Sequence, residues 1–329
     1  MRRRRAVISL ILVFVVLLVM KNKFTDHHHQ SCDVGWSYNN SRLALKGVRF
    51  NYNSQWETAL DWLDLSGDCH SGIDHLSSTG PIFVSAFSEN HFFEAKQMLT
   101  SFVDYFSGRT FKRLLIVYDI GLSELSGGLL KSYQKQGIQV RRFNFSKYPD
   151  YFRQLTEYRW KPVIIAEVLK EYPAIWWLDS SVVFRNKSVD IQRIEAWTSQ
   201  QPVQVTLFEN SSHSIFAATH PAMFRYFPVP EKAAKNLTMW SANHILFYAT
   251  HTVKKAVLRW WVVCALEPQC MAPLGAQLGC SFQKDRMNFH ANCHRFDQSA
   301  INLIVTLANN FSQDSYAYPY EKPIAIMRW

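Results

Sequence analysis

The stretch Ile175-Trp176-Trp177-Leu178-Asp179-Ser180-Ser181-Val182-Val183-Phe184 is an apolar run interrupted by one carboxylate and two hydroxyl groups. A continuous apolar run is typical of a strand that is buried on both faces. Polar residues at the carboxyl end of such a strand lie where open α/β sheets hold their ligands. Asp179 is therefore the centre of a candidate site. A core strand that ends in a turn-forming Asp would produce the same sequence pattern.

Segments with strand character alternate with segments of helical periodicity around this stretch. Strands are expected at 82–87, 114–118, 138–143 and 204–208, and helices at 56–65, 92–106, 123–136, 157–172, 221–227, 253–266 and 294–307. This alternation predicts an α/β fold, with a mostly parallel, Rossmann-like sheet flanked by helices. The sequence has no Gly-x-Gly-x-x-Gly after its first strand and no P-loop motif, which argues against dinucleotide-binding enzymes and P-loop NTPases.

The composition argues against both disorder and nucleic-acid binding. The chain has 329 residues, of which 48% are hydrophobic and 15% aromatic, so it can bury a sizeable core. Four of the charges behind the net +10 belong to the arginines at 2–5, and the others are spread along the chain. No basic run marks a nucleic-acid-binding arm.

Residues 6–20 are apolar except for Ser9, and Lys21 and Lys23 follow them. At 1.5 Å per residue this helix spans roughly 22 Å, which suits a short membrane anchor or the core of a cleaved signal peptide. The lack of a small-x-small pattern after Met20 favours an uncleaved signal anchor. By the positive-inside rule, 1–5 then form a cytosolic tail, 21–78 a stem with an irregular region, and 79–329 a lumenal domain.

Two further features indicate an oxidising lumen. Asn-x-Ser/Thr acceptors occur at Asn39, Asn144, Asn186, Asn210, Asn236 and Asn310. The six cysteines are even in number, and sequence alone leaves 15 pairings open. We expect Cys32 to pair with Cys69, and the four later cysteines to pair among themselves. A zinc site at Cys280, Cys293 and His294 is an alternative, but it lacks a Cys-x-x-Cys knuckle.

Four motifs together resemble one family of enzymes. They are Tyr118-Asp119-Ile120-Gly121-Leu122, Trp160-Lys161-Pro162, Trp177-Leu178-Asp179-Ser180-Ser181 and His294-Arg295-Phe296-Asp297-Gln298-Ser299. With the anchor and stem, they look like GT-A-fold glycosyltransferases of the secretory pathway, and more narrowly like a largely uncharacterised invertebrate, notably nematode, group. The resemblance covers about 81–329. It implies a nucleotide-sugar-binding half at 79–184 and an acceptor-binding half at 185–329.

The resemblance implies a metal ion beside Asp179. Typical members bind Mn²⁺ or Mg²⁺ through Asp-x-Asp, whereas this chain has Asp179-Ser180-Ser181 and lacks the second carboxylate. Asp179 and the Ser181 hydroxyl would be the metal ligands, together with donor phosphates and water. Alternatively, Lys161 or Arg159 would neutralise the diphosphate without metal. Lys161 as a solvated helix residue is the competing interpretation.

The resemblance also assigns the remaining donor-binding residues. Ser85, Ala86 and Phe87 would meet the base and ribose, and Tyr118 or Asp119 would close that pocket. Strand-end packing for Ser85 and Tyr118, and a turn for Asp119, explain these residues equally well.

Asp297 is the candidate catalytic carboxylate, with Glu209 in reserve. In an inverting transfer Asp297 would take the proton of the acceptor hydroxyl, and in a retaining transfer it would steady positive charge or position the acceptor. An acid in the first turn of a helix explains Asp297 without any catalytic role. Trp240, Asn243, His244 and Gln298 are candidates for the acceptor subsite, while core packing also explains Trp240.

These features predict a Golgi-membrane, single-pass type II glycosyltransferase that moves a sugar, expected to come from a UDP-sugar, to a glycan or glycoprotein. The alternative is an inactive relic of the fold that serves as a lumenal glycan-binding or chaperone-like protein, which the missing second carboxylate favours. A hydrolase with paired carboxylates would leave the nucleotide-binding half unexplained.

Overall fold

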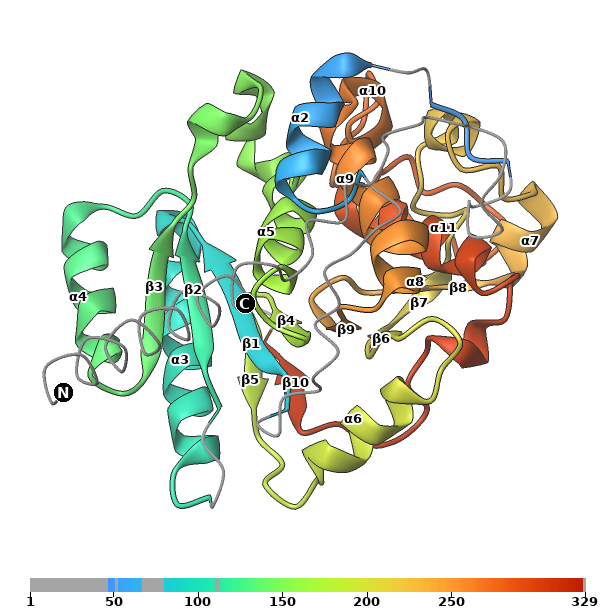
Figure 1. The fold of residues 1–329 in the computed structure, drawn as a ribbon. Coiled ribbons are helices and arrows are strands. Elements are labelled where there is room, and N and C mark those ends of the chain that lie inside the picture. The colour runs from blue at the N-terminus through green and yellow to red at the C-terminus, as the bar shows by residue number, and fades with distance from the viewer. Residues whose placement is uncertain (1–46, 51–52, 67–79, 110–112, 328–329) are drawn as a thin grey trace, which may run out of the picture. The chain divides into compact units, whose positions relative to one another are not determined.

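The computed structural model describes residues 47–50, 53–66, 80–109 and 113–327, all of which belong to one compact unit. Its central sheet has six strands in the order β3-β2-β1-β4-β9-β6 (Figure 1). The bounds are β1 Ile82–Phe87, β2 Leu115–Asp119, β3 Ile138–Arg142, β4 Ala174–Leu178, β6 Val205–Leu207 and β9 His244–Tyr248. Strands β3, β2, β1 and β4 run parallel, and β9 runs antiparallel to both β4 and β6. The expected mixed α/β fold with a mostly parallel sheet is confirmed.

Side chains of β4 alternate between two hydrophobic layers, as the pleat of a strand buried on both faces requires. Trp176 and Leu178 pack in one layer with α3 (Phe92–Phe106) and α6 (Ile191–Ser199). Ile175 and Trp177 pack in the other layer with α5 (Trp160–Leu169), α9 (Arg259–Leu266) and α11 (Phe296–Ala308). The sheet is therefore covered on both faces.

The apolar run at 175–184 is not one strand. After β4 the chain turns, with the Val182 N–H donating to the Asp179 carbonyl at 3.0 Å. Strand β5 (Val182–Phe184) then pairs antiparallel with β10 (Ile324–Ile326) in a separate sheet. The Asp-Ser-Ser interruption is thus the turn that takes the chain out of the central sheet.

Most expected helices are present with shifted ends. Helix α4 (Glu124–Gln134) begins at the expected cap, where the Ser126 N–H donates to Ser123 Oγ at 3.2 Å. Helix α5 begins three residues later than expected, because a 3₁₀ turn and the left-handed Tyr158 (φ 55°) precede it. The expected helix at 253–266 comprises α8 (His251–Val253), a π-helical turn (Lys254–Leu258) and α9.

The remaining elements frame the second half of the fold. They are α2 Ser54–Trp62, β7 Asn210–Ser214, α7 Glu231–Asn236, β8 Thr238–Trp240 and α10 Pro268–Met271. Helix α2 packs against α9, so part of the expected irregular region belongs to the core. The expected anchor at 6–20 lies outside the described residues, and none of the helices that are described is long and apolar enough to cross a membrane.

The four later cysteines pair among themselves, as expected. Cys264 is bonded to Cys270 and Cys280 to Cys293. The alternative zinc site is wrong, because both of its thiols are oxidised and His294 Nε2 lies 3.1 Å from the Met271 carbonyl. The expected pair Cys32–Cys69 lies outside the described residues.

Candidate active site

The strand order of the sheet reverses between β1 and β4, whose carboxyl ends lie side by side at the switch point. From β1 the chain proceeds to β2 and β3 on one side, and it then returns to place β4 on the other side of β1. Open α/β sheets bind ligands in the crevice outside such a switch point. Asp179 follows the last residue of β4, and its N–H donates to the Asn243 carbonyl at 2.8 Å. The main chain therefore fixes Asp179 at this edge.

One buried ammonium group joins two carboxylates there. Lys161 Nζ lies 3.0 Å from Asp179 Oδ1 and 2.6 Å from Asp297 Oδ2. It also donates hydrogen bonds to Asp179 Oδ2 at 3.4 Å and to the Ala242 carbonyl at 3.3 Å, while its contact with Asp297 is an ion pair. The side chains of Lys161 and Asp297 are 2% and 6% exposed, whereas that of Asp179 is 30% exposed. The structure thus brings together Trp-Lys-Pro, Trp-Leu-Asp and Phe-Asp-Gln, three motifs that are far apart in sequence.

Tryptophans hold both acidic residues in place. The Trp177 indole donates to Asp179 Oδ1 at 2.7 Å, and the Trp261 indole donates to the main-chain carbonyl of Asp297 at 3.2 Å. A tryptophan of the core therefore positions the carboxylate of Asp179, and another positions the main chain of Asp297.

Backbone strain occurs at two residues beside this cluster. Tyr158 has a φ of 55° and Phe296 a φ of 41°, in the left-handed region that bulky residues rarely adopt. Tyr158 lies three residues before Lys161, whose Nζ is 5.4 Å from the centre of the Tyr158 ring, and Phe296 immediately precedes Asp297. Strain of this kind is concentrated at functional sites in proteins.

The electrostatics of the cluster follow from one cation shared by two anions. Burial lowers the pKa of Lys161, but Asp179 and Asp297 together outweigh burial and raise it, so the ammonium is charged at neutral pH. Burial raises the pKa of Asp297 to about 6; Lys161 opposes this shift and the charge of Asp179 adds to it. A carboxylate with a pKa close to neutral can take up and release a proton under working conditions.

The divalent cation that the resemblance implies needs several oxygen ligands beside Asp179. Asp179 and Asp297 already pair with an ammonium group, whose positive charge lies 3.0 Å from Asp179 Oδ1. In the part of the chain that the structure describes, no three His, Cys, Asp or Glu side chains form a metal-binding group. These residues do not fit a metal held by the protein alone.

The two serines after Asp179 have different surroundings. The Ser180 hydroxyl donates to Glu94 Oε2 at 3.2 Å, across the switch point. Ser181 is half-buried, and its carbonyl accepts the Met327 N–H at 2.8 Å. Glu94, on α3, is a residue of this edge that the sequence analysis did not identify.

The other expected donor-binding residues line the end of β1 and β2. Ser85, Ala86 and Phe87 are buried in β1, and the Ser85 hydroxyl has no hydrogen-bond partner within the described ranges. Tyr118 is buried beneath Arg141, and burial raises the pKa of its phenol. Asp119 caps a turn through the Gly121 and Leu122 N–H groups, both at 2.8 Å.

Arg159 does not join the carboxylate cluster. Its guanidinium group pairs with Glu157 at 2.5 Å and donates to the carbonyls of Ala265, Glu267 and Pro268. These bonds anchor the end of α9, so Arg159 has a structural role here.

The expected acceptor residues separate into two groups. Asn243 and Gln298 are half-buried beside the cluster, and Gln298 Nε2 donates to Ser211 Oγ at 3.2 Å. His244 instead lies in the core between the rings of Trp176 and Phe208, at 5.3 and 4.1 Å, and burial holds its pKa well below the usual range.

Trp240 and Glu209 have structural partners. The N–H and carbonyl of Trp240 bond the Asn302 side chain at 2.8 and 2.7 Å. The Glu209 carboxylate pairs with Lys322 at 2.8 Å.

Two functional candidates escaped the sequence analysis. Arg295 precedes Phe296 in a motif that was already identified, and its side chain is half-buried beside Asp297 and Tyr158. Arg286 lies in the loop before that motif and interacts electrostatically with Arg295. The adjacency of Arg295 to Asp297 was the available signal, whereas nothing in the sequence indicated Arg286.

Comparison with protein families finds one match, at residues 21–166, to a family described as a protein of unknown function (DUF1647). The match spans less than half of the chain. Comparison with the curated proteins finds none that matches this sequence.

Solved structures similar to this chain include three glycosyltransferases. They are the apo bifunctional glycosyltransferase WbbM (10% identity, TM-score 0.46, 71% of this chain and 38% of that one), mouse xyloside xylosyltransferase 1 (12%, 0.42, 73% and 85%) and the galactosyltransferase LgtC with donor and acceptor sugar analogs (16%, 0.33, 51% and 57%). The chain thus spans well under half of WbbM. At these scores the likeness carries no argument about function, which rests on the site itself.

Proposed function

We propose that this protein is a glycosyltransferase that moves a sugar from a nucleoside diphosphate donor, a UDP-sugar in the first instance, to a hydroxyl group of a glycan or glycoprotein. The observation that carries the proposal is the convergence of Lys161, Asp179 and Asp297 at the switch point of the sheet. A crevice at that place suits a nucleotide, and the two carboxylates suit the sugar to be transferred.

The reaction breaks the bond between the anomeric carbon and the diphosphate oxygen and forms a bond from that carbon to the acceptor oxygen. The acceptor hydroxyl must lose its proton, and the Asp297 carboxylate receives it. The pKa of about 6 suits this role, because the group is largely ionised at neutral pH and yet basic enough to accept a proton. Asp179, the more exposed carboxylate, accepts hydrogen bonds from hydroxyl groups of the donor.

Lys161 positions the two carboxylates. It is buried, and Asp179 and Asp297 already share its positive charge. We place it as a positioning residue that keeps Asp297 ionised, and no step of the transfer depends on a divalent cation held by the protein.

We also propose that the catalytic domain lies in the Golgi lumen behind a type II signal anchor at 6–20. Two disulfides and exposed sequon asparagines support an oxidising, glycosylating compartment. The exposed acceptors are Asn144, Asn210, Asn236 and Asn310.

The test measures nucleotide binding and sugar transfer by the full chain. UDP- and GDP-sugars are screened with a mixed glycan acceptor panel, once with Mn²⁺ and once with chelator. Turnover of one donor that Asp179→Asn abolishes supports the proposal. The matched control is Asp150→Asn, whose carboxylate is fully exposed, and it should retain transfer. Failure of the wild-type chain to bind any nucleotide would overturn the proposal.

A second candidate is a glycan-binding protein of the same fold without transferase activity. The observation that favours it is the burial of Asp297, whose side chain is ion-paired with Lys161 and only 6% exposed. Nucleotide or glycan binding without turnover of any donor in the same screen would select this candidate.

A further inference from the structure

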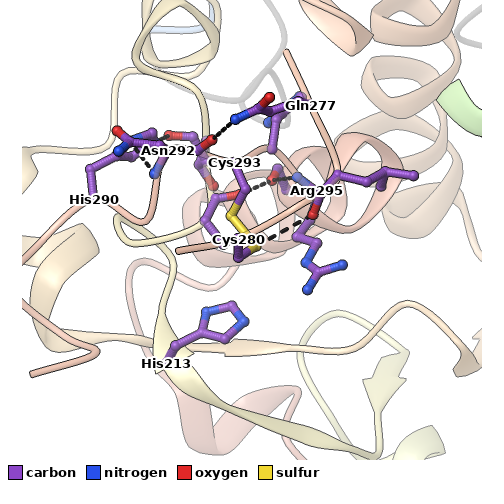
Figure 2. The surroundings of a disulfide bond; sticks show 12 residues. His213, Gln277, Cys280, His290, Asn292, Cys293 and Arg295 are labelled. Atoms are coloured by element: carbon purple, nitrogen blue, oxygen red, sulfur yellow. Dashed lines mark hydrogen bonds between the residues drawn. A yellow bond between two sulfur atoms is a disulfide. The ribbon is translucent and has the colours of Figure 1, made fainter. Parts of the chain in front are cut away.

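Three basic side chains lie near one another in the second half of the fold, where Arg286 and His213 both pack against the ring of Phe282. Arg295 precedes α11, Arg286 lies in the loop closed by Cys280–Cys293, and His213 lies in β7. Figure 2 shows the guanidinium group of Arg295 and the ring of His213 on the same side of this disulfide. The charges of both arginines act on His213, whose pKa is lowered first by burial and then by them.

Among the residues that the structure describes, neither arginine forms an ion pair with an acidic side chain. Within the described ranges, no carboxylate lies within ion-pair distance of Arg286 or Arg295, and Arg286 Nε is buried without a hydrogen-bond partner. The neighbouring Asp285 is engaged in its own turn, where Oδ1 accepts the Met287 and Asn288 N–H groups at 2.8 and 3.1 Å. Burial lowers the pKa of Arg295 and Arg286 lowers it further, whereas Tyr158 and Asp297 act to raise it. Two half-buried like charges that form no ion pair with a carboxylate are unfavourable unless a ligand supplies a counter-charge.

The fold holds these groups firmly. The disulfide fixes the ends of the Arg286 loop. Ser214 binds the loop through two hydrogen bonds: its N–H donates to the Arg286 carbonyl at 3.1 Å, and its hydroxyl donates to the Met287 carbonyl at 2.6 Å. The Arg286 guanidinium lies 4.2 Å from the centre of the Phe282 ring. The Arg295 N–H donates to the Ala218 carbonyl at 3.1 Å. A rigid backbone around two arginines that form no ion pair is what a preorganised anion site requires.

We propose that Arg286 and Arg295 form an oxyanion subsite that binds an acid group, a carboxylate or a sulfate, of the acceptor glycan. This inference rests on the proposed transferase function and names its acceptor class as an acidic glycan. Guanidinium groups bind both kinds of oxyanion with paired hydrogen bonds.

The order of charges places the subsite on the acceptor side. Lys161 joins Asp179 at the switch point to Asp297. Arg295 lies two residues before Asp297 in the chain and interacts electrostatically with both Asp297 and Arg286. The subsite is thus separated from the nucleotide crevice by the proton-accepting carboxylate. A sugar whose hydroxyl group meets Asp297 would have its acid group within reach of Arg295.

The test measures binding of a heparin-derived hexasaccharide, which carries both carboxylates and sulfates, and of UDP to the full chain by calorimetry. Arg286→Gln and Arg295→Gln should each weaken hexasaccharide binding roughly 10- to 100-fold, as expected for the loss of a charge-assisted hydrogen-bond pair. UDP binding should stay within about twofold of the wild-type value, because substitutions at sites without shared partners act almost independently. The matched control is Lys284→Gln, which removes the same charge from an exposed position of the same loop and should change hexasaccharide affinity less than about twofold.

Two results would overturn the subsite. Equal weakening by Lys284→Gln would show that the hexasaccharide senses net charge alone. Loss of UDP affinity in the arginine variants would assign the subsite to the donor phosphates. UDP binding by the wild-type chain is a separate readout of the proposed function, so a failure there is distinguishable from a failure of the subsite. Melting curves of the variants confirm that each one is folded.

Discussion

Replacement of Lys161 by Met tests the central feature of the site. The change removes an ammonium group that lies 2.6 Å from Asp297 and 3.0 Å from Asp179 and leaves the buried Asp297 without a counter-charge. Removal of one partner from a buried ion pair costs roughly 3–5 kcal/mol of unfolding free energy. The partly exposed Asp179 can be solvated, so most of this loss comes from Asp297.

The sign of the pH dependence follows from the pKa of Asp297. Its folded value of about 6 lies above the unfolded value of about 3.9, so protonation favours the folded state. That stabilisation is fully present below the unfolded pKa and is lost as the pH rises through the folded pKa. Lys161→Met raises the folded pKa further. The variant should therefore lose roughly 3–5 kcal/mol at pH 8 but about 2 kcal/mol or less at pH 5.

The assay is urea unfolding followed by tryptophan fluorescence at the two pH values. Lys254→Met is the matched control, because Lys254 pairs at 2.7 Å with Asp64, a carboxylate that is 33% exposed. Its loss should be nearly equal at pH 5 and pH 8. The double variant Lys161→Met/Asp297→Asn should recover most of the loss at pH 8. An equal loss at both pH values for Lys161→Met would refute the view that Asp297 is the ionised, buried partner.

Three further predictions concern the proposed chemistry. The transfer rate of the wild type should rise as the pH increases through about 6, because the ionised form of Asp297 is the active one. The variant Asp297→Asn should bind UDP normally but transfer the sugar at least about 100-fold more slowly. Retained transfer in this variant would remove Asp297 from the mechanism. Chelation of divalent cations should change UDP affinity and the transfer rate less than about twofold, because the ammonium group of Lys161 already pairs with Asp179. A loss of transfer that added Mn²⁺ restores would contradict this prediction. The double variant Cys280→Ser/Cys293→Ser removes a disulfide with a sequence separation of 13. It should lose roughly 3 kcal/mol of unfolding free energy and should bind the hexasaccharide more weakly. Unchanged hexasaccharide affinity in a folded variant would show that the disulfide does not preorganise Arg286.

The sequence predicted the local elements because local patterns determine them. The apolar run before Asp179 indicated a buried strand, and Ser123 with the periodicity after it predicted α4. The predicted ends of helices and strands were less accurate where contacts between distant segments decide them. Val182–Phe184, for example, pairs with β10, and no local pattern of residues indicates that partner.

For the site, the sequence identified the acidic residues but not their arrangement. Asp179 and Asp297 were recognisable because each carboxylate borders an apolar element, whereas a Lys or Arg near the start of a helix looks the same whether it is solvated or buried. The destination of each side chain depends on packing between distant segments. The structure buries Lys161 between the two carboxylates, assigns Arg159 to main-chain carbonyls of α9 and α10, and places His244 among aromatic rings.

The sequence alone therefore determined that this chain forms an alternating α/β fold with a carboxylate after a buried strand, because periodicity and apolar runs are properties of neighbouring residues. Only the tertiary structure decided that one ammonium group pairs with two carboxylates and that the charges of Arg286 and Arg295 interact. Those relations depend on chain crossings and a disulfide that bring together residues far apart in sequence, and electrostatic interactions depend on distance in space.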